Sequence, residues 1–278
     1  MADKIKIKAK TPLFDLKLKE LFKYKDLIWL FFKRNYSTRY KQTILGPAWL
    51  IISPLFTIFC YTILFGKMAG LSTDGIPQPL FYLSGTIFWS FFTDCFNSTC
   101  NTFTANAGIL GKVYFPRLVI PISNIITSFF DFIIRLCLMS IFILYYFWNG
   151  MGLFITWKII FIPFYLLQIG ILAMGVGIII SSITTKYKDL QILVGFGIQL
   201  WMYATPIIYS TSFVPEKWKG LFLLNPVTPA TLMFKNAFFG TDFFSLKYFG
   251  FSCIITFIVF CLGIIIFNQV EKTFMDTV

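Results

Sequence analysis

Residues 106–117 read NAGILGKVYFPR and carry two cations, Lys112 and Arg117, between two long apolar runs. The 278-residue chain around them is 57% hydrophobic and only 13% charged. Soluble domains carry about a quarter charged residues, so this chain has too little charge to cover a water-facing surface. The composition predicts an integral membrane protein in which residues 106–117 form a compact cytoplasmic loop between two spanning helices.

Six apolar segments are long enough to span a membrane, which takes about 20 residues at a rise of about 1.5 Å each. The third and fourth are overlong, so we expect tilt or extension beyond the bilayer. We predict an all-α membrane domain over residues 45–270, between a cytoplasmic basic segment (1–44) and a cytoplasmic tail (271–278). The six predicted spans are residues 45–66, 80–103, 118–147, 153–181, 190–209 and 248–270.

Half of the cationic side chains precede the first apolar segment, since residues 1–44 hold 12 of the 24 Lys and Arg residues. With this segment inside, the cytoplasmic segments carry 17 cations and the external segments carry six. The positive-inside rule then places both termini in the cytoplasm. Such a basic flank suits an anionic membrane surface, and no nucleic-acid recognition module accompanies it, so nucleic acid is not an expected partner.

Two further segments are apolar without being spans. Residues 12–34 repeat apolar side chains at helical spacing and predict an amphipathic interfacial helix, with a solvated basic tail as the alternative. The external segment 211–247 is apolar and aromatic but is interrupted by Pro215, Pro226 and Pro229. We expect short helices there that rest in the outer leaflet or re-enter the membrane.

The sequence offers little for catalysis. It has no histidine, and its six cysteines form no CxxC pair, which removes the commonest general base and favours no metal site. The phosphate-binding pattern GxxxxGK followed by Ser or Thr is also absent. We therefore predict no catalytic residue, no metal site and no bound cofactor, so that any ATP and Mg²⁺ belong to a separate subunit.

The predicted span 80–103 has two different faces at helical periodicity. Its polar face indicates either one wall of a pathway or hydrogen bonding between helices. The polar face holds Ser90, Asp94, Asn97, Ser98 and Asn101, and the aromatic face holds Phe81, Phe88, Trp89, Phe92, Phe96 and Phe103.

Two other patterns inside the spans predict packing. Asp131 and Arg135 are four residues apart, so we expect them to form an ion pair on one face of their helix. Ala173, Gly177 and Ser181 form a ridge of small residues, which allows another helix to approach closely.

Aromatic residues in the first and fifth predicted spans exceed what interfacial belts require. Such rings can stack on the C–H faces of sugars without fixing one register, although a core or lipid-facing role is the alternative for each residue. Together with three residues of the second span, they form a candidate glycan conduit. Its members are Trp49, Phe56, Phe59, Tyr61, Trp89, Phe92, Asp94, Trp201 and Tyr203.

Several stretches, taken together and in order, resemble the membrane subunit of polysaccharide ABC exporters. This is the type-2 permease family of Wzm-like O-antigen exporters and their capsule and teichoic-acid relatives. The stretches are 39–49 (RYKQTILGPAW), 101–103 (NTF), 106–107 (NA), 112–117 (KVYFPR), 187–189 (YKD), 205–209 (TPIIY), 214–218 (VPEKW) and 224–228 (LNPVT).

The resemblance implies a homodimer of six-span protomers in the bacterial inner membrane, each docked to a cytoplasmic ATPase and exporting a lipid-linked glycan. An exporter of teichoic acid, capsule, or a small lipid or drug is the alternative. The resemblance makes 106–117 the coupling helix and 213–246 re-entrant helices, while residues 232–236 (LMFKN) depart from many relatives. The implied ATPase contacts are Asn106, Ile109, Leu110, Lys112, Tyr114, Phe115 and Arg117, and the implied lipid-headgroup entrance is Arg34, Arg39, Lys41 and Gln42.

Overall fold

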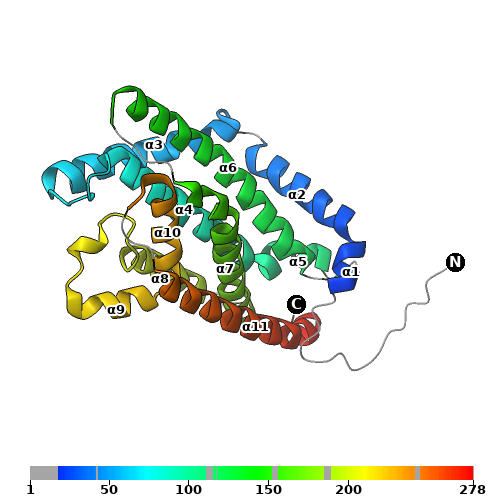
Figure 1. Cartoon of the computed structure of the whole chain (residues 1–278). Helices are drawn as coiled ribbons and strands as arrows, with labels where there is room; N and C mark the ends of the chain where they lie inside the picture. Colours follow the sequence, from blue (N-terminus) through cyan, green and yellow to red (C-terminus); the bar gives the residue numbers. More distant parts are fainter. Residues whose placement is uncertain are drawn as a thin grey trace.

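The computed structural model describes residues 18–41, 43–110, 115–116, 118–151, 156–184, 189–241 and 245–277. In this part of the chain all regular structure is helical (Figure 1). The helices are α1 (Leu18–Lys23), α2 (Lys25–Tyr40), α3 (Trp49–Tyr61), α4 (Gln78–Cys100), α5 (Thr102–Leu110), α6 (Val119–Trp148), α7 (Ile162–Thr184), α8 (Leu190–Tyr203), α9 (Glu216–Leu224), α10 (Val227–Phe239) and α11 (Leu246–Thr277). Shorter helical turns are η1 (Gly46–Ala48), η2 (Thr62–Met68), η3 (Trp157–Phe161) and η4 (Thr211–Phe213).

Four helical segments of the described chain are long and apolar enough to cross a membrane. They are Gly46–Met68, Val119–Trp148, Trp157–Thr184 and Leu246–Phe267, and they match the first, third, fourth and sixth predicted spans. The other two predicted spans appear as α4, which carries the polar face, and as α8, which is a shorter apolar helix of 14 residues. The all-helical membrane fold is thus confirmed in this coarser form.

Prolines and one glycine set the ends of the short helices at the end of the bundle opposite α5. Pro215 and Pro226 stand directly before α9 and α10, where a missing backbone N–H costs nothing. Gly240 ends α10 in the left-handed conformation with φ 62°, which a residue without a side chain adopts readily. Residues 211–247 thus contain short helices, as expected, while their place at the outer leaflet stays a prediction.

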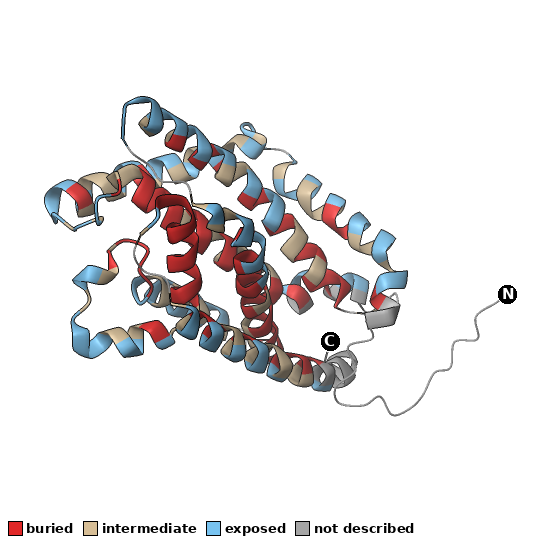
Figure 2. Ribbon diagram, viewed as in Figure 1, coloured by how far each residue is buried: buried red, intermediate tan, exposed pale blue. Residues whose placement is uncertain are grey.

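The core of the protein lies on α4, α7 and α10. Helix α7 packs against α11 and α4, and α4 also packs against α6. Every one of the 13 residues of α10 is buried, as Figure 2 shows in red. By contrast, α8 has no buried residue, and α3 buries only Leu50 and Ile58.

Small residues make the close contacts of α7 possible, as the predicted ridge required. A Cβ added at Gly177 would lie 2.8 Å from the Cβ of Thr99 in α4. A Cβ at Gly175 would lie 2.9 Å from the Cα of Phe260 in α11. The ridge residues Ala173 and Ser181 are also buried, so the packing role of this face is confirmed.

The predicted interfacial helix is two helices, α1 and α2, and it continues past residue 34 to Tyr40. Leu21, Phe31 and Phe32 are buried, with the Phe32 ring centroid 4.8 Å from that of Phe130 in α6. Phe22 and Trp29 remain exposed on the outer side of these helices. Helix α2 therefore packs along α6 through one apolar face and presents a second apolar surface outward.

Candidate functional site

A polar cavity of about 540 Å³ opens beside the polar face of α4, between α2, α5 and α6. We call it the amide pocket because five of its lining side chains are asparagines. The two-faced character of α4 is confirmed, since its aromatic face lies in the core and its polar face lines this pocket. The lining residues are Arg34, Asn35, Thr38, Arg39, Asp94, Asn97, Ser98, Asn101, Ala105, Asn106 and Asn124.

Amide side chains hold the helices around this pocket together. Asn35 of α2 donates to Oδ1 of Asn124 in α6 at 2.8 Å, and Asn124 donates to the carbonyl of Ser98 in α4 at 2.9 Å. Asn106 of α5 donates to the carbonyl of Thr102 at 3.0 Å. Neither Asn35 nor Asn124 was predicted as a site residue. For Asn124, an amide inside an apolar segment is itself a signal of a polar contact, whereas Asn35 lies in a polar stretch (KRNYSTRY, 33–40) that gives no such signal.

Arg34 is the one lining cation whose hydrogen bonds in the described chain go to neutral groups. Its Nη2 donates to Oδ1 of Asn106 at 2.8 Å and to Oδ1 of Asn35 at 3.1 Å. Its guanidinium carbon lies 4.5 Å from the centroid of the Phe31 ring. These contacts orient the side chain but leave its positive charge without a carboxylate among the described residues.

The expected ion pair between Asp131 and Arg135 within α6 is wrong. Asp131 pairs instead with Arg39 of α2 and accepts a hydrogen bond from Tyr40 at 3.2 Å. Arg135 pairs with Asp94 of α4 at 2.8 Å. The i, i+4 spacing allows a contact along one helix, but each buried charge has a partner on a neighbouring helix that neutralises it.

These ion pairs leave the amide pocket with a net positive charge. Burial lowers the pKa of Arg39, but the carboxylates of Asp131 and Asp94 outweigh it and raise the pKa above its usual value. Burial lowers the pKa of Arg34, which stays protonated because an arginine does not lose its proton in proteins. With both carboxylates paired, Arg34 supplies the excess charge. The pocket therefore favours an anionic group of small size.

A second, smaller cavity of about 150 Å³ lies deeper in the bundle and is lined by Trp49, Tyr61 and Trp89. We call it the aromatic pocket. Arg135 also lines it, and its partner Asp94 lines the amide pocket, so one ion pair separates the two cavities. Three predicted conduit residues from two different helices are thus brought together.

The remaining conduit residues are dispersed. Phe56 and Phe59 are exposed on α3, and Tyr203 is exposed at the end of α8. Phe92 is fully buried, with its ring centroid 5.2 Å from that of Trp201. Phe92 is therefore a packing residue within the core, whereas the exposed rings on α3 and α8 face outward.

Of the residues predicted for ATPase coupling, Asn106 and Ile109 lie in α5, at one end of the bundle (Figure 1). Ile109 is 37% exposed, whereas Asn106 and Phe115 are buried, Phe115 with its ring centroid 5.6 Å from that of Phe31. For the headgroup entrance, Lys41 caps α2. Lys112, Tyr114, Arg117 and Gln42 lie outside the described residues, and for Leu110 the description covers only its place in α5.

Apolar helices that enclose polar and charged pockets are typical of a membrane transport protein. Residues 26–239 match the ABC-2 type transporter family, and the chain belongs to it.

Named relatives make the similarity more specific. Two O-antigen export system permease proteins RfbA from Klebsiella pneumoniae are 30% identical over 256 residues, covering 90% of this chain and 94% of theirs. An O-antigen export system permease protein RfbA from Myxococcus xanthus is 27% identical over 225 residues, covering 80% and 84% of the two chains. The polysialic acid transport protein KpsM from Escherichia coli is 21% identical over 215 residues, covering 74% and 78%.

Proposed function

We propose that this protein is the membrane subunit of an ATP-driven exporter of lipid-linked polysaccharide, O-antigen in type. The observation that carries the proposal is the similarity to O-antigen export permeases along 90% of the chain. The relative named for polysialic acid transport supports the same class of substrate, a long glycan. Export proceeds from the cytoplasm across the bacterial inner membrane, with both termini in the cytoplasm.

We propose that the protomer has six spans, counting α4 and α8, and works as a homodimer. Support comes from α3 and α8, whose side chains are almost all outside the core of the protomer. Exposed aromatic residues on them, such as Phe56 and Phe196, form surfaces that a second copy can cover. The conduit then lies between the two protomers, with the external segment 211–247 forming re-entrant helices at its outer end.

The two pockets support a route for the substrate. The excess charge of Arg34 in the amide pocket suits the phosphate or pyrophosphate of a lipid headgroup, as the inferred entrance requires. The sugar chain follows past Trp49, Tyr61 and Trp89, whose rings offer apolar faces without a single tight site. Asp94 and Arg135 neutralise each other between the pockets and so do not hold a charged group there.

The motor is a separate ATPase that binds ATP and Mg²⁺ and docks on residues 106–117. We expect Arg117→Glu to leave membrane insertion intact and to reduce co-purification of the ATPase, because the substitution reverses one of the two cations of the loop. Lys217→Glu, in α9 at the opposite end of the bundle, is the matched control. Normal co-purification with Arg117→Glu would contradict the docking role.

The glycan route has its own test. Replacing Trp49, Phe56 and Trp201 together by alanine should strongly reduce the polysaccharide that reaches the cell surface, measured with antiserum at equal protein levels. Trp157→Ala removes an exposed ring that lines neither pocket and should leave export unchanged. Unaltered export by the triple variant would favour an exporter of a small lipid or drug, or a conduit with a different lining.

A further inference from the structure

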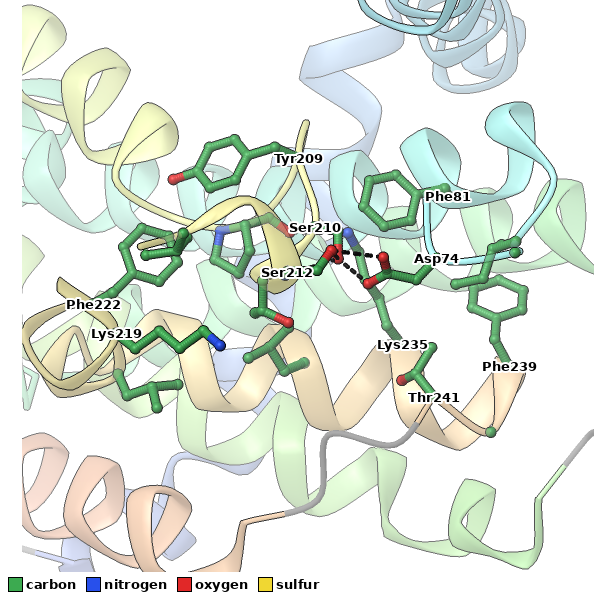
Figure 3. Close-up of a pocket in the computed structure, with 18 residues that line it drawn as sticks. Asp74, Phe81, Tyr209, Ser210, Ser212, Lys219, Phe222, Lys235, Phe239 and Thr241 are labelled. Carbon is green, nitrogen blue, oxygen red and sulfur yellow. Dashed lines mark hydrogen bonds between the residues drawn. The ribbon is translucent and has the colours of Figure 1, made fainter. Parts of the chain in front are cut away.

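A third cavity, of about 620 Å³, lies at the end of the bundle opposite α5 (Figures 1 and 3). We call it the far-end pocket. It is formed where the turn before α4, the segment after α8, and helices α9 and α10 meet. Its volume falls within the range of about 300–1,000 Å³ that is common for ligand sites.

One carboxylate organises the polar side of the far-end pocket. Asp74 accepts hydrogen bonds from Ser212 at 2.7 Å and from Ser210 (Figure 3). Ser72 also donates to it at 3.3 Å. Burial raises the pKa of Asp74, but these hydroxyl groups outweigh it and hold the pKa below its usual value. Asp74 therefore stays ionised, and it adopts the left-handed conformation at φ 51°, uncommon for a residue with a side chain.

Two aromatic rings form the opposite side. Tyr209 and Phe222 have ring centroids 5.8 Å apart, and Figure 3 shows them across Ser210 and Ser212 from Asp74. The Tyr209 hydroxyl donates to the carbonyl of Tyr203 at 2.7 Å, which fixes the ring in place. Because Tyr203 is the last residue of α8, this hydrogen bond joins the aromatic side of the pocket to the end of a helix that carries candidate conduit residues.

The two lysines of the pocket have different roles. Lys235 is buried and donates to the carbonyl oxygens of Pro206 at 2.9 Å and Ile207 at 3.3 Å, so it forms part of the floor. Lys219 is paired with Glu216 and extends from α9 toward the middle of the pocket (Figure 3). The pocket thus combines an acceptor, hydroxyl donors, an ammonium donor and an apolar platform.

This combination restricts the chemistry of the occupant. A hard divalent cation takes six or more oxygen ligands, with several carboxylates, and among the described residues Asp74 is the only carboxylate lining the cavity. An anion would meet the charge of Asp74, and a wholly apolar molecule would cover Asp74 and Ser212 without adding to the hydrogen bond that they make with each other. A neutral ring that carries hydroxyl groups satisfies the acceptor and donors and can stack on Tyr209 and Phe222.

We infer that the far-end pocket binds a sugar unit of the translocated polysaccharide after it leaves the conduit. The inference rests on the proposed function and extends it, because it assigns a glycan contact to residues outside the candidate conduit. Asp74 and Ser212 hold ring hydroxyls, while Tyr209 and Phe222 contact the C–H face. One weak contact at this end would favour forward movement of the chain without stopping it.

Photo-cross-linking in cells that make the glycan, with the ATPase present, tests the pocket. Phe222→p-benzoylphenylalanine should give an adduct that antiserum against the glycan detects. The same residue at Trp157, which is exposed at the same end but lines no part of the pocket, is the background control. The same residue at Trp49 reports the conduit. We expect adducts at positions 222 and 49, several-fold above position 157.

A second variant shows whether Ser212 holds the sugar. In the Phe222 cross-linking background, Ser212→Ala should lower the adduct about two- to tenfold through loss of one hydrogen bond. Ser72→Ala, which also loses a hydrogen bond to Asp74 but lies outside the lining, should not.

The outcomes separate the pocket from the proposed function. An adduct at position 49 with only background at 222 overturns the pocket and leaves the conduit standing. Background at both positions overturns both. An adduct at 222 that Ser212→Ala and Ser72→Ala leave equally strong overturns the assignment of Ser212.

Discussion

Helices α7 and α8 follow one another in the chain and are similarly apolar, yet α7 is largely buried and α8 lies at the surface. Of the 23 residues of α7, 15 are buried, whereas none of the 14 residues of α8 is. Both contain glycines, but Gly177 of α7 faces Thr99 closely, while Gly195 and Gly197 of α8 face open space. Apolar composition therefore shows that a helix avoids water, and only its contacts show what covers it.

The same difference supports the position proposed for the transport surface. A buried helix such as α7 holds the protomer together and cannot line a path for a bulky substrate. An exposed helix such as α8, or α3 with Phe56 and Phe59, must be covered by lipid, by a second copy or by the substrate. The proposed conduit therefore belongs to α3 and α8, with α4 contributing only the residues at its edge.

Matched glycine substitutions give the largest expected effect. Gly177→Leu should prevent stable folding, because its Cβ alone would approach Thr99 at 2.8 Å and the cost of overpacking is about 3 kcal/mol or more. Gly197→Leu should leave unfolding unchanged, since nothing lies within 4 Å of the added Cβ. The measurement is the unfolding midpoint of purified protein in mixed detergent micelles.

The two glycine variants also test whether α8 lies at the surface of the protomer. If Gly197→Leu destabilises the isolated protomer as much as Gly177→Leu, α8 is packed inside the protomer and not at its surface. If Gly197→Leu folds normally but no longer associates with a second copy, the proposed dimer surface includes the face of α8 that carries Gly197.

Helix α6 combines both kinds of surface, and its buried side depends on charge. Arg39→Met should cost about 3 kcal/mol, because it leaves the fully buried Asp131 carboxylate without its cation. Asp131→Leu should cost less, since the Arg39 side chain is 40% exposed and can turn to water. The double variant should recover most of the loss from Arg39→Met in the same detergent unfolding experiment.

Equal losses for the two single variants, with no recovery in the double variant, would contradict a direct pair. In that case the contribution of Arg39 would come from its other contacts in the amide pocket.

Much of the helical framework could be predicted, because apolar length depends on composition alone. The predicted span 118–147 corresponds to α6, and the ends of the predicted span 153–181 differ from those of the helical segment Trp157–Thr184 by at most four residues. The predicted span 190–209 is too long, since α8 ends at Tyr203, shortly before Pro206. Proline position would have given that end more accurately than hydropathy.

Partners distant in sequence could not be predicted. Arg39 and Asp131 are 92 residues apart, so no local spacing indicates their contact, and the local spacing of Asp131 and Arg135 indicated the wrong one. The two faces of α4 were predictable because periodicity within one helix decides them. Which helix covers each face depends on the whole bundle.

The end of α8 is where the exposed helix is attached to the rest, and Asn225 makes the attachment. It accepts from Nε1 of Trp201 at 2.9 Å and donates to the carbonyl of Ala204 at 3.1 Å. Asn225→Ala should cost about 1 kcal/mol and speed hydrogen exchange of the amides at the end of α8, with α7 unchanged. Gln191→Ala, exposed at the start of α8, is the control, and equal acceleration in α7 would contradict a local attachment.

The smallest expected effect concerns Lys235, which joins the buried helix α10 to the segment directly after α8. Burial lowers the pKa of its amine to about 7, and the nearby charge of Asp74 opposes that shift. An unfolded lysine keeps its proton to about pH 10, so above pH 7 the unfolded state binds more protons and stability rises with pH. Below pH 7 both states are protonated and the dependence is flat.

From pH 6.5 to 7.5 we expect a gain in the free energy of unfolding of less than about 1 kcal/mol. Lys235→Met keeps a long apolar side chain in place of the amine and should remove this step. As the control, Asn225→Ala should show the same pH dependence of stability as the unmodified protein. A step that persists in Lys235→Met would belong to another titratable group. A stability of the unmodified protein that stays flat over this range would mean that the carbonyl oxygens of Pro206 and Ile207 hold the amine charged. The segment directly after α8 would then be attached to α10 by a permanently charged lysine. The exposed part of this region would end close to the last residue of α8, Tyr203, and the buried part would begin shortly after it.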